Sequence, residues 1–287
     1  MTSRSFRRIA RLSAGLFVGF IGISFAIASD SPLEYACQKI GGRLKSVGAQ
    51  TCMQSGLSIG TANSVRGVPI LYRDFAARSQ KATPYRVMLI GGTHGDELTS
   101  VSMVFQWMQR LDKERFQPFQ WRVIPCLNPD GLLTQPATRV NANGVDLNRN
   151  YPTKDWDERA LIYWKTKTHS DKRRYPGSKA SSEPETRALM ELIGSFRPDA
   201  IVTIHAPYGV LDYDGPRDPP SKFGYLHLQL LGTYPGSLGN YAGINLGLPV
   251  ITLELSSAGQ MPTPAQQQSI WGDMLTWLNK NLPKRPE

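Results

Sequence analysis

The run Gly-Gly-Thr-His-Gly-Asp-Glu occupies residues 91–97 and directly follows an apolar, β-type stretch at residues 87–90. Apolar side chains then recur at helical spacing over residues 97–111, which predicts a strand, a short loop and a helix. His94 and Glu97 lie three residues apart where the expected strand ends, so both side chains can face one point in space. An imidazole nitrogen and a carboxylate oxygen are two of the ligands that zinc accepts. The stretch therefore predicts a strand–helix unit of an α/β fold together with part of a metal site.

β-type runs alternate with helical patterns along most of the chain. The strands are expected at residues 86–90, 121–126, 200–204 and 249–253, with a short one at 70–72, and the helices at 97–111, 183–196 and 264–278. This alternation is typical of an α/β fold whose mixed, largely parallel sheet is covered by helices on both faces. In such sheets ligands bind beyond the carboxyl ends of the strands.

The chain divides into three expected parts. Residues 1–28 place four arginines before an apolar stretch that ends in Ala-Ile-Ala, which is the pattern of a secretory signal peptide. An uncleaved anchor in the inner membrane is the alternative to an exported, periplasmic protein. Residues 29–80 are expected to form a small N-terminal extension, and residues 81–287 the catalytic domain.

Composition and charge limit the kinds of molecule that this protein is expected to bind. Hydrophobic residues make up 40% of the chain and charged residues 20%, as in an ordinary globular protein. The formal net charge is +10, and four of the positive charges lie in the predicted leader. We find no basic block and no zinc-finger or helix-turn-helix pattern, so we expect no nucleic-acid partner. No other segment approaches the ~20 apolar residues that span a bilayer, so a membrane partner is expected only if the leader stays attached.

The three cysteines suggest an oxidising compartment. In an exported protein Cys37 and Cys52 form a natural disulfide pair, which would stabilise the fold by about 3 kcal/mol. Two unpaired thiols are the alternative. Cys126 ends an apolar run and is expected to be a buried strand residue.

A third metal ligand is available at another strand end. His205 follows the β-type residues 201–204, just as His94 follows residues 87–90. With Glu97 the two histidines would make a three-ligand site whose fourth position is open, which is the mark of catalytic zinc. A hydrogen-bonded loop or core residue is the commoner role of a single histidine, but two such histidines accompany the His-x-x-Glu pair here.

Glu254 is the candidate base, because it follows the largely apolar residues 250–253 at one more strand end. A carboxylate in such a run is costly to bury without a purpose. As a general base it would take a proton from the attacking water and pass it to the leaving amine. The alternative is a glutamate on an edge strand that points to solvent.

Two arginines occur in the polar run at residues 139–151. Arg149 and the neighbouring Asn148 offer a forked donor and an amide, which suit the grip of a carboxylate through two hydrogen bonds. Arg139 could polarise the carbonyl of the bond to be cleaved and stabilise its oxyanion. Either arginine alone would be a surface residue by default.

Taken in order, these elements resemble the M14 zinc carboxypeptidase family. The matching elements are His-Gly-Asp-Glu at 94–97, Asn-Pro-Asp-Gly at 128–131, Arg139, Gly-Val-Asp-Leu-Asn-Arg-Asn at 144–150, His205, and Thr-Leu-Glu at 252–254. The resemblance implies a zinc carboxypeptidase-like fold with one zinc ion per chain. It assigns the zinc ligands to His94, Glu97 and His205, the substrate's terminal carboxylate to Asn148 and Arg149, carbonyl polarisation to Arg139, and the base to Glu254.

Within that family the chain is most similar to the compact bacterial murein peptide amidases. The resemblance rests on the short spacing between His205 and Glu254, the sequence of residues 91–97, and the segment Tyr-Pro-Gly-Ser-Leu-Gly at 234–239. The resemblance implies hydrolysis of the bond between γ-D-glutamate and meso-diaminopimelate in cell-wall peptides. The predicted leader and the extension depart from this subfamily. Digestive members of the family also carry a mobile tyrosine over the substrate, for which Tyr234 and Tyr241 are both candidates here.

Two other functions compete with this interpretation. The related deacylases, of the succinylglutamate desuccinylase and aspartoacylase type, perform the same metal chemistry on N-acyl amino acids. The Asn-Pro-Asp-Gly segment, the paired arginines and the export signal favour the peptidase. A non-catalytic wall-binding module would have lost a ligand or the base, and none is lost.

Asp212 and Asp214 are the candidates for side-chain specificity, and we expect them in the loop after His205. An acid at this place could meet the ammonium group of a diaminopimelate or lysine side chain. The alternative is a turn-forming acid before Gly215-Pro216.

Overall fold

The computed structural model describes residues 1, 31–79 and 84–282, so the predicted leader falls outside the described residues except for Met1. Within them, one mixed sheet of nine strands forms the centre of the molecule, in the order β1-β2-β4-β3-β5-β9-β6-β8-β7. The strands are β1 (Ser58–Asn63), β2 (Pro69–Phe75), β3 (Tyr85–Ile90), β4 (Phe119–Ile124), β5 (Ala200–His205), β6 (Val210–Asp214), β7 (Lys222–Phe223), β8 (Leu226–Leu228) and β9 (Val250–Glu254).

The middle of the sheet is parallel. Strands β4, β3, β5 and β9 run side by side in one direction, while β2 is antiparallel to β4 and β6 is antiparallel to β9. The carboxyl ends of β3, β5 and β9 therefore meet at one edge of the sheet. This is the edge at which the sequence predicted the functional residues.

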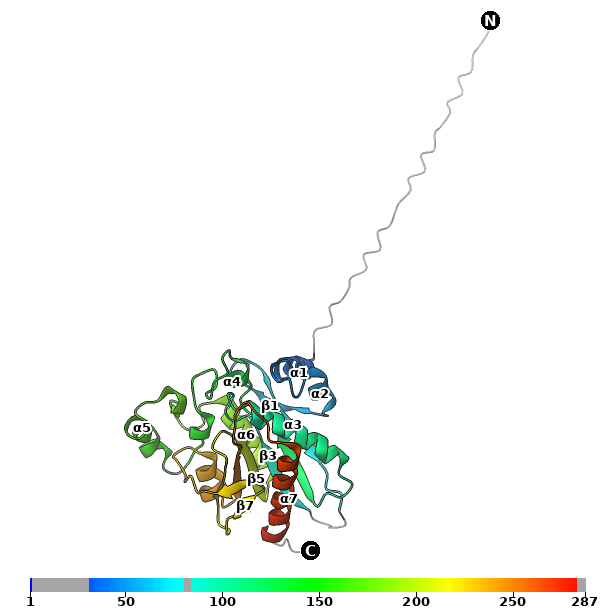
Figure 1. The fold of residues 1–287 in the computed structure, drawn as a ribbon. Coiled ribbons are helices and arrows are strands. Elements are labelled where there is room, and N and C mark those ends of the chain that lie inside the picture. Colours follow the sequence, from blue (N-terminus) through cyan, green and yellow to red (C-terminus); the bar gives the residue numbers. More distant parts are fainter. Residues whose placement is uncertain (2–30, 80–83, 283–287) are drawn as a thin grey trace.

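Helices cover both faces of the sheet (Figure 1). The α-helices are α1 (Pro32–Arg43), α2 (Ala49–Gln54), α3 (Leu98–Lys113), α4 (Pro129–Leu133), α5 (Trp156–Thr166), α6 (Pro184–Phe196) and α7 (Pro264–Asn281); shorter turns are the 3-10 helices η1 (Leu147–Arg149) and η2 (Lys172–Arg174) and the π-helix η3 (Gly239–Asn245). No described helix is both long enough and apolar enough to cross a membrane.

Side chains alternate between two cores, as the pleat of a strand requires. In β3, Val87 and Leu89 pack into the core that contains α3 and α7, whereas Met88 and Ile90 pack into the core that contains α6. Because both faces are buried, the interior positions of β3, β5 and β9 are mostly apolar, at residues 87–90, 201–204 and 250–253. The predicted fold class, a largely parallel sheet covered on both faces, is confirmed.

Local signals set where the long helices begin. Pro184 occupies the first turn of α6, where its missing N–H costs nothing. Helix α7 starts with a capping box, in which the backbone N–H of Gln266 donates to Thr263 Oγ1 and the backbone N–H of Thr263 donates to Gln266 Oε1.

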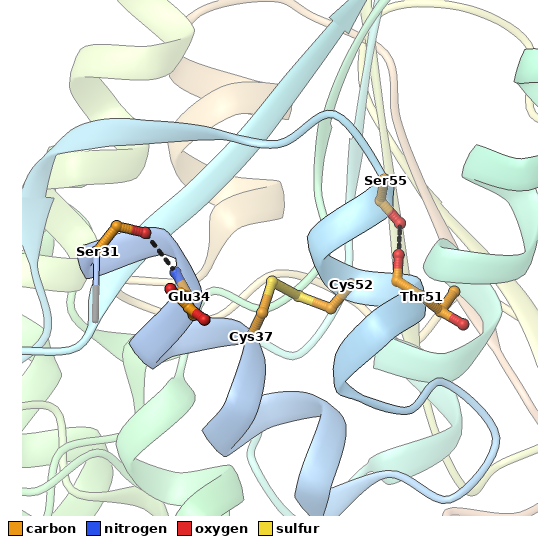
Figure 2. The surroundings of a disulfide bond; sticks show 6 residues. All are labelled: Ser31, Glu34, Cys37, Thr51, Cys52 and Ser55. Atoms are coloured by element: carbon orange, nitrogen blue, oxygen red, sulfur yellow. Dashed lines mark hydrogen bonds between the residues drawn. A yellow bond between two sulfur atoms is a disulfide. The ribbon is translucent and has the colours of Figure 1, made fainter. Parts of the chain in front are cut away.

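The N-terminal helices are tied together by a disulfide. Cys37 in α1 and Cys52 in α2 are bonded, with their Cα atoms 5.3 Å apart, and both are buried (Figure 2). The predicted pairing is present. The hydroxyl of Ser31 accepts a hydrogen bond from the backbone N–H of Glu34 and so caps α1 (Figure 2). Buried residues of α1 belong to the same core as α3 and α7.

Two local expectations were wrong. Asp212 and Asp214 lie in strand β6 rather than in a loop, because the chain turns at Gly209 (φ +70°) and pairs antiparallel with β9. Cys126 is buried as expected, but it lies beyond β4, which ends at Ile124 where its pairing with β3 ends.

Candidate active site

Two strand ends and one helix start bring the predicted metal ligands together. His94 lies in the loop after β3, Glu97 immediately precedes α3, and His205 is the last residue of β5. The loop carrying His94 packs closely on α4, since a Cβ at Gly95 would collide with the backbone of Gly131. Glycine at this position therefore allows the approach that seats the two ligands.

The ligand atoms form a compact triangle. His94 Nδ1 lies 2.7 Å from Glu97 Oε1, His205 Nδ1 lies 3.0 Å from Glu97 Oε2, and the two Nδ1 atoms are 3.1 Å apart. Zinc bonds of roughly 2.0–2.1 Å in tetrahedral geometry place ligand atoms about 3.3 Å from one another. All three residues are buried, and together they form a candidate metal-binding group. The spacing and the donor set both fit zinc.

The ionisation of Glu97 depends on the two neighbouring histidines. Burial by itself would raise the pKa of Glu97, but His94 and His205 outweigh it and hold that pKa far below its usual range. Glu97 is thus a carboxylate, the form in which it can bind a cation.

Asp146 fixes the orientation of His94. Its Oδ1 atom lies 3.1 Å from His94 Nε2, and its Oδ2 atom accepts a hydrogen bond of 2.9 Å from Arg139 Nε. Burial would raise the pKa of Asp146, but Arg139 and His94 keep it well below the ordinary value. With Nε2 donating to this carboxylate, Nδ1 of His94 keeps its lone pair for a metal, the arrangement usual for metal-binding histidines.

The sequence analysis assigned no role to Asp146. The signal available was its place in the polar run that also carries Arg139 and Arg149, together with the burial of an acid. Its contact with His94 joins residues 52 positions apart, which the fold alone establishes.

Arg139 lies at the edge of the metal triangle. Its Nη1 atom is 3.1 Å from His94 Nδ1 and 3.7 Å from Glu97 Oε1. Burial lowers the pKa of Arg139, but Asp146 and Glu97 reverse this effect, so the guanidinium stays charged. A fixed positive charge at this place is of the kind that can stabilise negative charge developing on an oxygen atom.

Glu254 is buried at the end of an interior strand. It is the last residue of β9 and pairs with His205 across the ladder. Burial raises its pKa, and Glu254 Oε2 has no hydrogen-bond partner among the described residues. The alternative of a solvent-facing glutamate on an edge strand is wrong, since β9 lies between β5 and β6.

Arg149 is a buried cation rather than a surface residue, with only 7% of it exposed. Its Nη1 atom donates to the carbonyl oxygen of Asn148, its Nε has no partner among the described residues, and its guanidinium lies 4.3 Å from the ring centre of Tyr234. Asn148 is held by its own Oδ1, which accepts from the backbone N–H of Leu238. Gly236 (φ +79°) packs directly against the backbone of Arg149. A Cβ at this position would collide with the Arg149 carbonyl oxygen, so only glycine allows the two segments to lie this close.

The predicted site residues line one cavity of about 430 Å³. Its walls include the metal triangle, both predicted arginines, Asn148 and the candidate base, and also Tyr234, Asp212 and Asp214. Tyr241 is not among its lining residues and instead stacks on Tyr151, with ring centres 5.6 Å apart. Of the two predicted candidates, Tyr234 is therefore the one that lines the cavity, and Tyr208 lines it as well.

Comparison with known proteins gives the family of the chain. The zinc carboxypeptidase family model matches residues 55–221. Murein peptide amidase A of Vibrio campbellii is 35% identical over 199 residues, which cover 67% of this chain and 76% of the relative.

Solved structures agree with the fold. The crystal structure of murein-tripeptide amidase MpaA from Escherichia coli O157 is 28% identical with a TM-score of 0.52, covering 81% of this chain and 93% of that one. Carboxypeptidase A from Helicoverpa armigera is 18% identical with a TM-score of 0.58, covering 85% of this chain and 70% of that one. At that lower identity the likeness concerns the fold alone.

Proposed function

The chain belongs to the zinc carboxypeptidase family, a family of zinc-dependent metallopeptidases, and we propose that it is an exported enzyme that releases meso-diaminopimelate from γ-D-glutamyl-diaminopimelate bonds in cell-wall peptides. The observation that carries the proposal is the match to murein peptide amidase A over two thirds of the chain. Family membership also favours a peptide substrate over the small N-acyl amino acids of the deacylases.

In the proposed mechanism the residues act in three places around the metal. His94, Glu97 and His205 would hold the zinc ion, which would supply Lewis acidity for the hydrolysis near neutral pH. Glu254 accepts the proton of the attacking water and returns it to the leaving amine. Its raised pKa suits this role, because a base works best when its pKa lies near the working pH. Arg139 stabilises the oxyanion.

Arg149 and Asn148 set the register of the substrate. The Arg149 guanidinium is desolvated and incompletely paired, so a terminal carboxylate would gain charge-assisted hydrogen bonds there. Binding the carboxylate at this fixed point places the preceding amide bond over the metal triangle. That requirement restricts hydrolysis to the last residue of a peptide.

Asp212 and Asp214 favour a substrate side chain that ends in an ammonium group. Both line the cavity, and burial raises the pKa of each. Asp212 Oδ1 accepts from the backbone N–H of Leu231, whereas the pKa of Asp214 is raised to about 7, by burial and then by Asp212. An ammonium group would relieve the repulsion between the two acids. Their place in a strand, rather than in a turn, also supports a role in binding.

Export is supported by two features of the N-terminal part. The leader pattern at residues 1–28 indicates secretion. The disulfide between Cys37 and Cys52 is of the kind that persists in oxidising compartments such as the periplasm.

The test uses protein from Ser29 onward, loaded with zinc, and reads products by mass spectrometry. The substrates are L-Ala-γ-D-Glu-meso-diaminopimelate, a panel of ordinary peptides with C-terminal L-residues, and an N-succinyl amino acid. Release of diaminopimelate that a chelator abolishes is the expected result. Cleavage of the ordinary peptides alone would overturn the cell-wall assignment, and cleavage of the succinyl compound alone would establish a deacylase.

A further inference from the structure

Two more arginines line the cavity besides Arg139 and Arg149. Arg173 and Arg174 belong to η2, in the segment between α5 and α6, and neither has a role in the mechanism above. Their exposure differs from that of the buried Arg149: 58% of the Arg173 side chain and 41% of the Arg174 side chain are exposed. They therefore stand at the mouth of the cavity, where a bound peptide extends toward solvent.

The segment that carries these arginines is anchored to the site. The carbonyl oxygen of Tyr175 accepts a hydrogen bond of 2.8 Å from the backbone N–H of Asp146, the residue that orients His94. On the other side, Asp171 Oδ1 caps η2 by accepting from the backbone N–H of Arg173, and the Trp164 indole donates to the Asp171 carbonyl. The backbone beneath the two guanidinium groups is thus fixed relative to the metal triangle.

Both guanidinium groups are available to a ligand. Arg173 pairs with Asp96 Oδ2 at 2.7 Å, and Arg174 meets Asp171 Oδ2 at 3.6 Å. Exposed ion pairs of this kind contribute little, so a substrate carboxylate can replace either partner. Asp96 lies between the ligands His94 and Glu97 in sequence, which places Arg173 over the metal loop.

The other groups of the cavity are assigned to the residue that is released. Arg173 and Arg174 are therefore the groups that remain for the acyl side of the substrate. The terminal residue that is released has its carboxylate at Arg149 and its side chain at Asp212 and Asp214. What emerges past the metal triangle toward the mouth is the acyl part of the peptide. A γ-linked glutamate in that part keeps a free α-carboxylate, whereas an ordinary α-linked residue has none at the corresponding place.

We propose that Arg173 and Arg174 form a subsite for the free α-carboxylate of a γ-linked glutamyl residue on the acyl side of the cleaved bond. The inference rests on the proposed function and deepens it. The two arginines select an isopeptide bond over an ordinary peptide bond, because a guanidinium group binds a carboxylate through two parallel charge-assisted hydrogen bonds.

The experiment compares two tripeptides that differ in one group. One is L-Ala-γ-D-Glu-meso-diaminopimelate, and the other carries an amide in place of the α-carboxylate of its glutamate. For the wild-type enzyme we expect amidation to lower kcat/KM about tenfold or more. The variants Arg173→Ala and Arg174→Ala should lose most of that difference, by slowing cleavage of the acid form and leaving cleavage of the amide form nearly unchanged.

Lys172→Ala is the matched control. It removes a positive charge from the same turn, but Lys172 does not line the cavity, so it should preserve the wild-type preference. Zinc content and thermal unfolding check that each variant is folded. The conservative variants Arg173→Lys and Arg174→Lys should recover part of the preference, which a purely structural role would not predict.

The outcomes separate this inference from the proposed function. Equal cleavage of both tripeptides by the wild-type enzyme would overturn the subsite and leave the proposed function intact. A wild-type preference that both alanine variants retain would assign the preference elsewhere and also overturn the inference. Failure to cleave either tripeptide, with cleavage of ordinary peptides, would overturn the proposed function and the subsite with it.

Discussion

His205 and Glu254 stand directly opposite each other as the last residues of the neighbouring parallel strands β5 and β9. A metal ligand and the candidate base are therefore placed by the backbone ladder itself. Sites built on strands hold their geometry more exactly than sites on loops. A one-residue slip of β9 would turn Glu254 to the opposite face of the sheet.

Glu254→Gln should abolish turnover and keep the zinc. The amide retains the shape of the side chain but cannot accept a proton, and loss of a general base costs about 10²–10⁴-fold in rate. The measurement is kcat on the tripeptide together with zinc per chain, and the exposed Glu191→Gln serves as the control. Turnover near the wild-type rate would remove Glu254 from the mechanism.

Asp146→Asn should weaken zinc binding about 10- to 100-fold, as the loss of a hydrogen-bond partner behind a metal-bound histidine does. Asparagine can no longer provide the two carboxylate oxygens that hold His94 and Arg139. Competition with a chelator of known affinity measures the change. An unchanged zinc affinity would show that His94 keeps its orientation without this carboxylate.

Arg149→Lys should lower kcat/KM about 10- to 100-fold, because lysine cannot offer a two-pronged contact to the terminal carboxylate. The control is Arg159→Lys, at an exposed arginine in α5. In the variant Arg149→Ala, added guanidinium ions should restore part of the activity. If Arg149→Lys kept full activity, the terminal carboxylate would have to bind elsewhere.

Asp214 should make the stability of the protein fall as the pH rises toward neutral. Burial and Asp212 raise its pKa in the folded protein to about 7 from an ordinary value of 3.8. Between these values the folded state keeps a proton that the unfolded state has lost, so raising the pH through this window removes stability. Asp214→Asn should lose that part of the pH dependence.

The measurement for Asp214 is the free energy of unfolding at pH 5 and pH 8 in wild type and variant. The wild type should lose more stability than Asp214→Asn between the two pH values. Asp218→Asn, at an exposed position four residues on, should behave as the wild type does. Equal losses in wild type and Asp214→Asn would show that this acid has an ordinary pKa.

Replacing Cys37 and Cys52 together by alanine should lower the free energy of unfolding by about 3 kcal/mol, the value expected for a loop of this length. The catalytic residues lie outside α1 and α2, so kcat/KM at 25 °C should stay unchanged. Denaturant unfolding of the variant, and of reduced wild type as the control, measures the effect. A parallel fall in kcat/KM would mean that the bond supports the cavity directly.

The sequence predicted the central sheet because its strands are buried on both faces. The runs that became β3, β5 and β9 are mostly apolar, and each has a histidine or a glutamate at its carboxyl end or in the loop after it. The same pattern brought His94, His205 and Glu254 to one edge, where the cavity lies. A buried parallel strand can thus be located in the sequence by its apolar run, and its carboxyl end by the polar residue that comes after that run.

The parts that were missed depend on contacts distant in sequence. Strand β6 alternates apolar and acidic residues over a short stretch, and its antiparallel pairing with β9 joins segments about forty residues apart. Asp146 acquires its role only when the fold brings it to His94 and Arg139. Arg173 and Arg174 look like a solvated basic turn until the hydrogen bond between Asp146 and Tyr175 brings that turn to the cavity.

The disulfide also bears on the order in which the chain assembles. Residues 31–79 precede most of the sheet in the sequence, yet β2 pairs with β4 at residues 119–124, further along the chain. The bond between Cys37 and Cys52 spans only 15 positions, so its closure needs nothing beyond α2. Oxidation can thus join the two N-terminal helices before the sheet has formed. The disulfide then keeps their apolar residues together until the core that they share with α3 is complete.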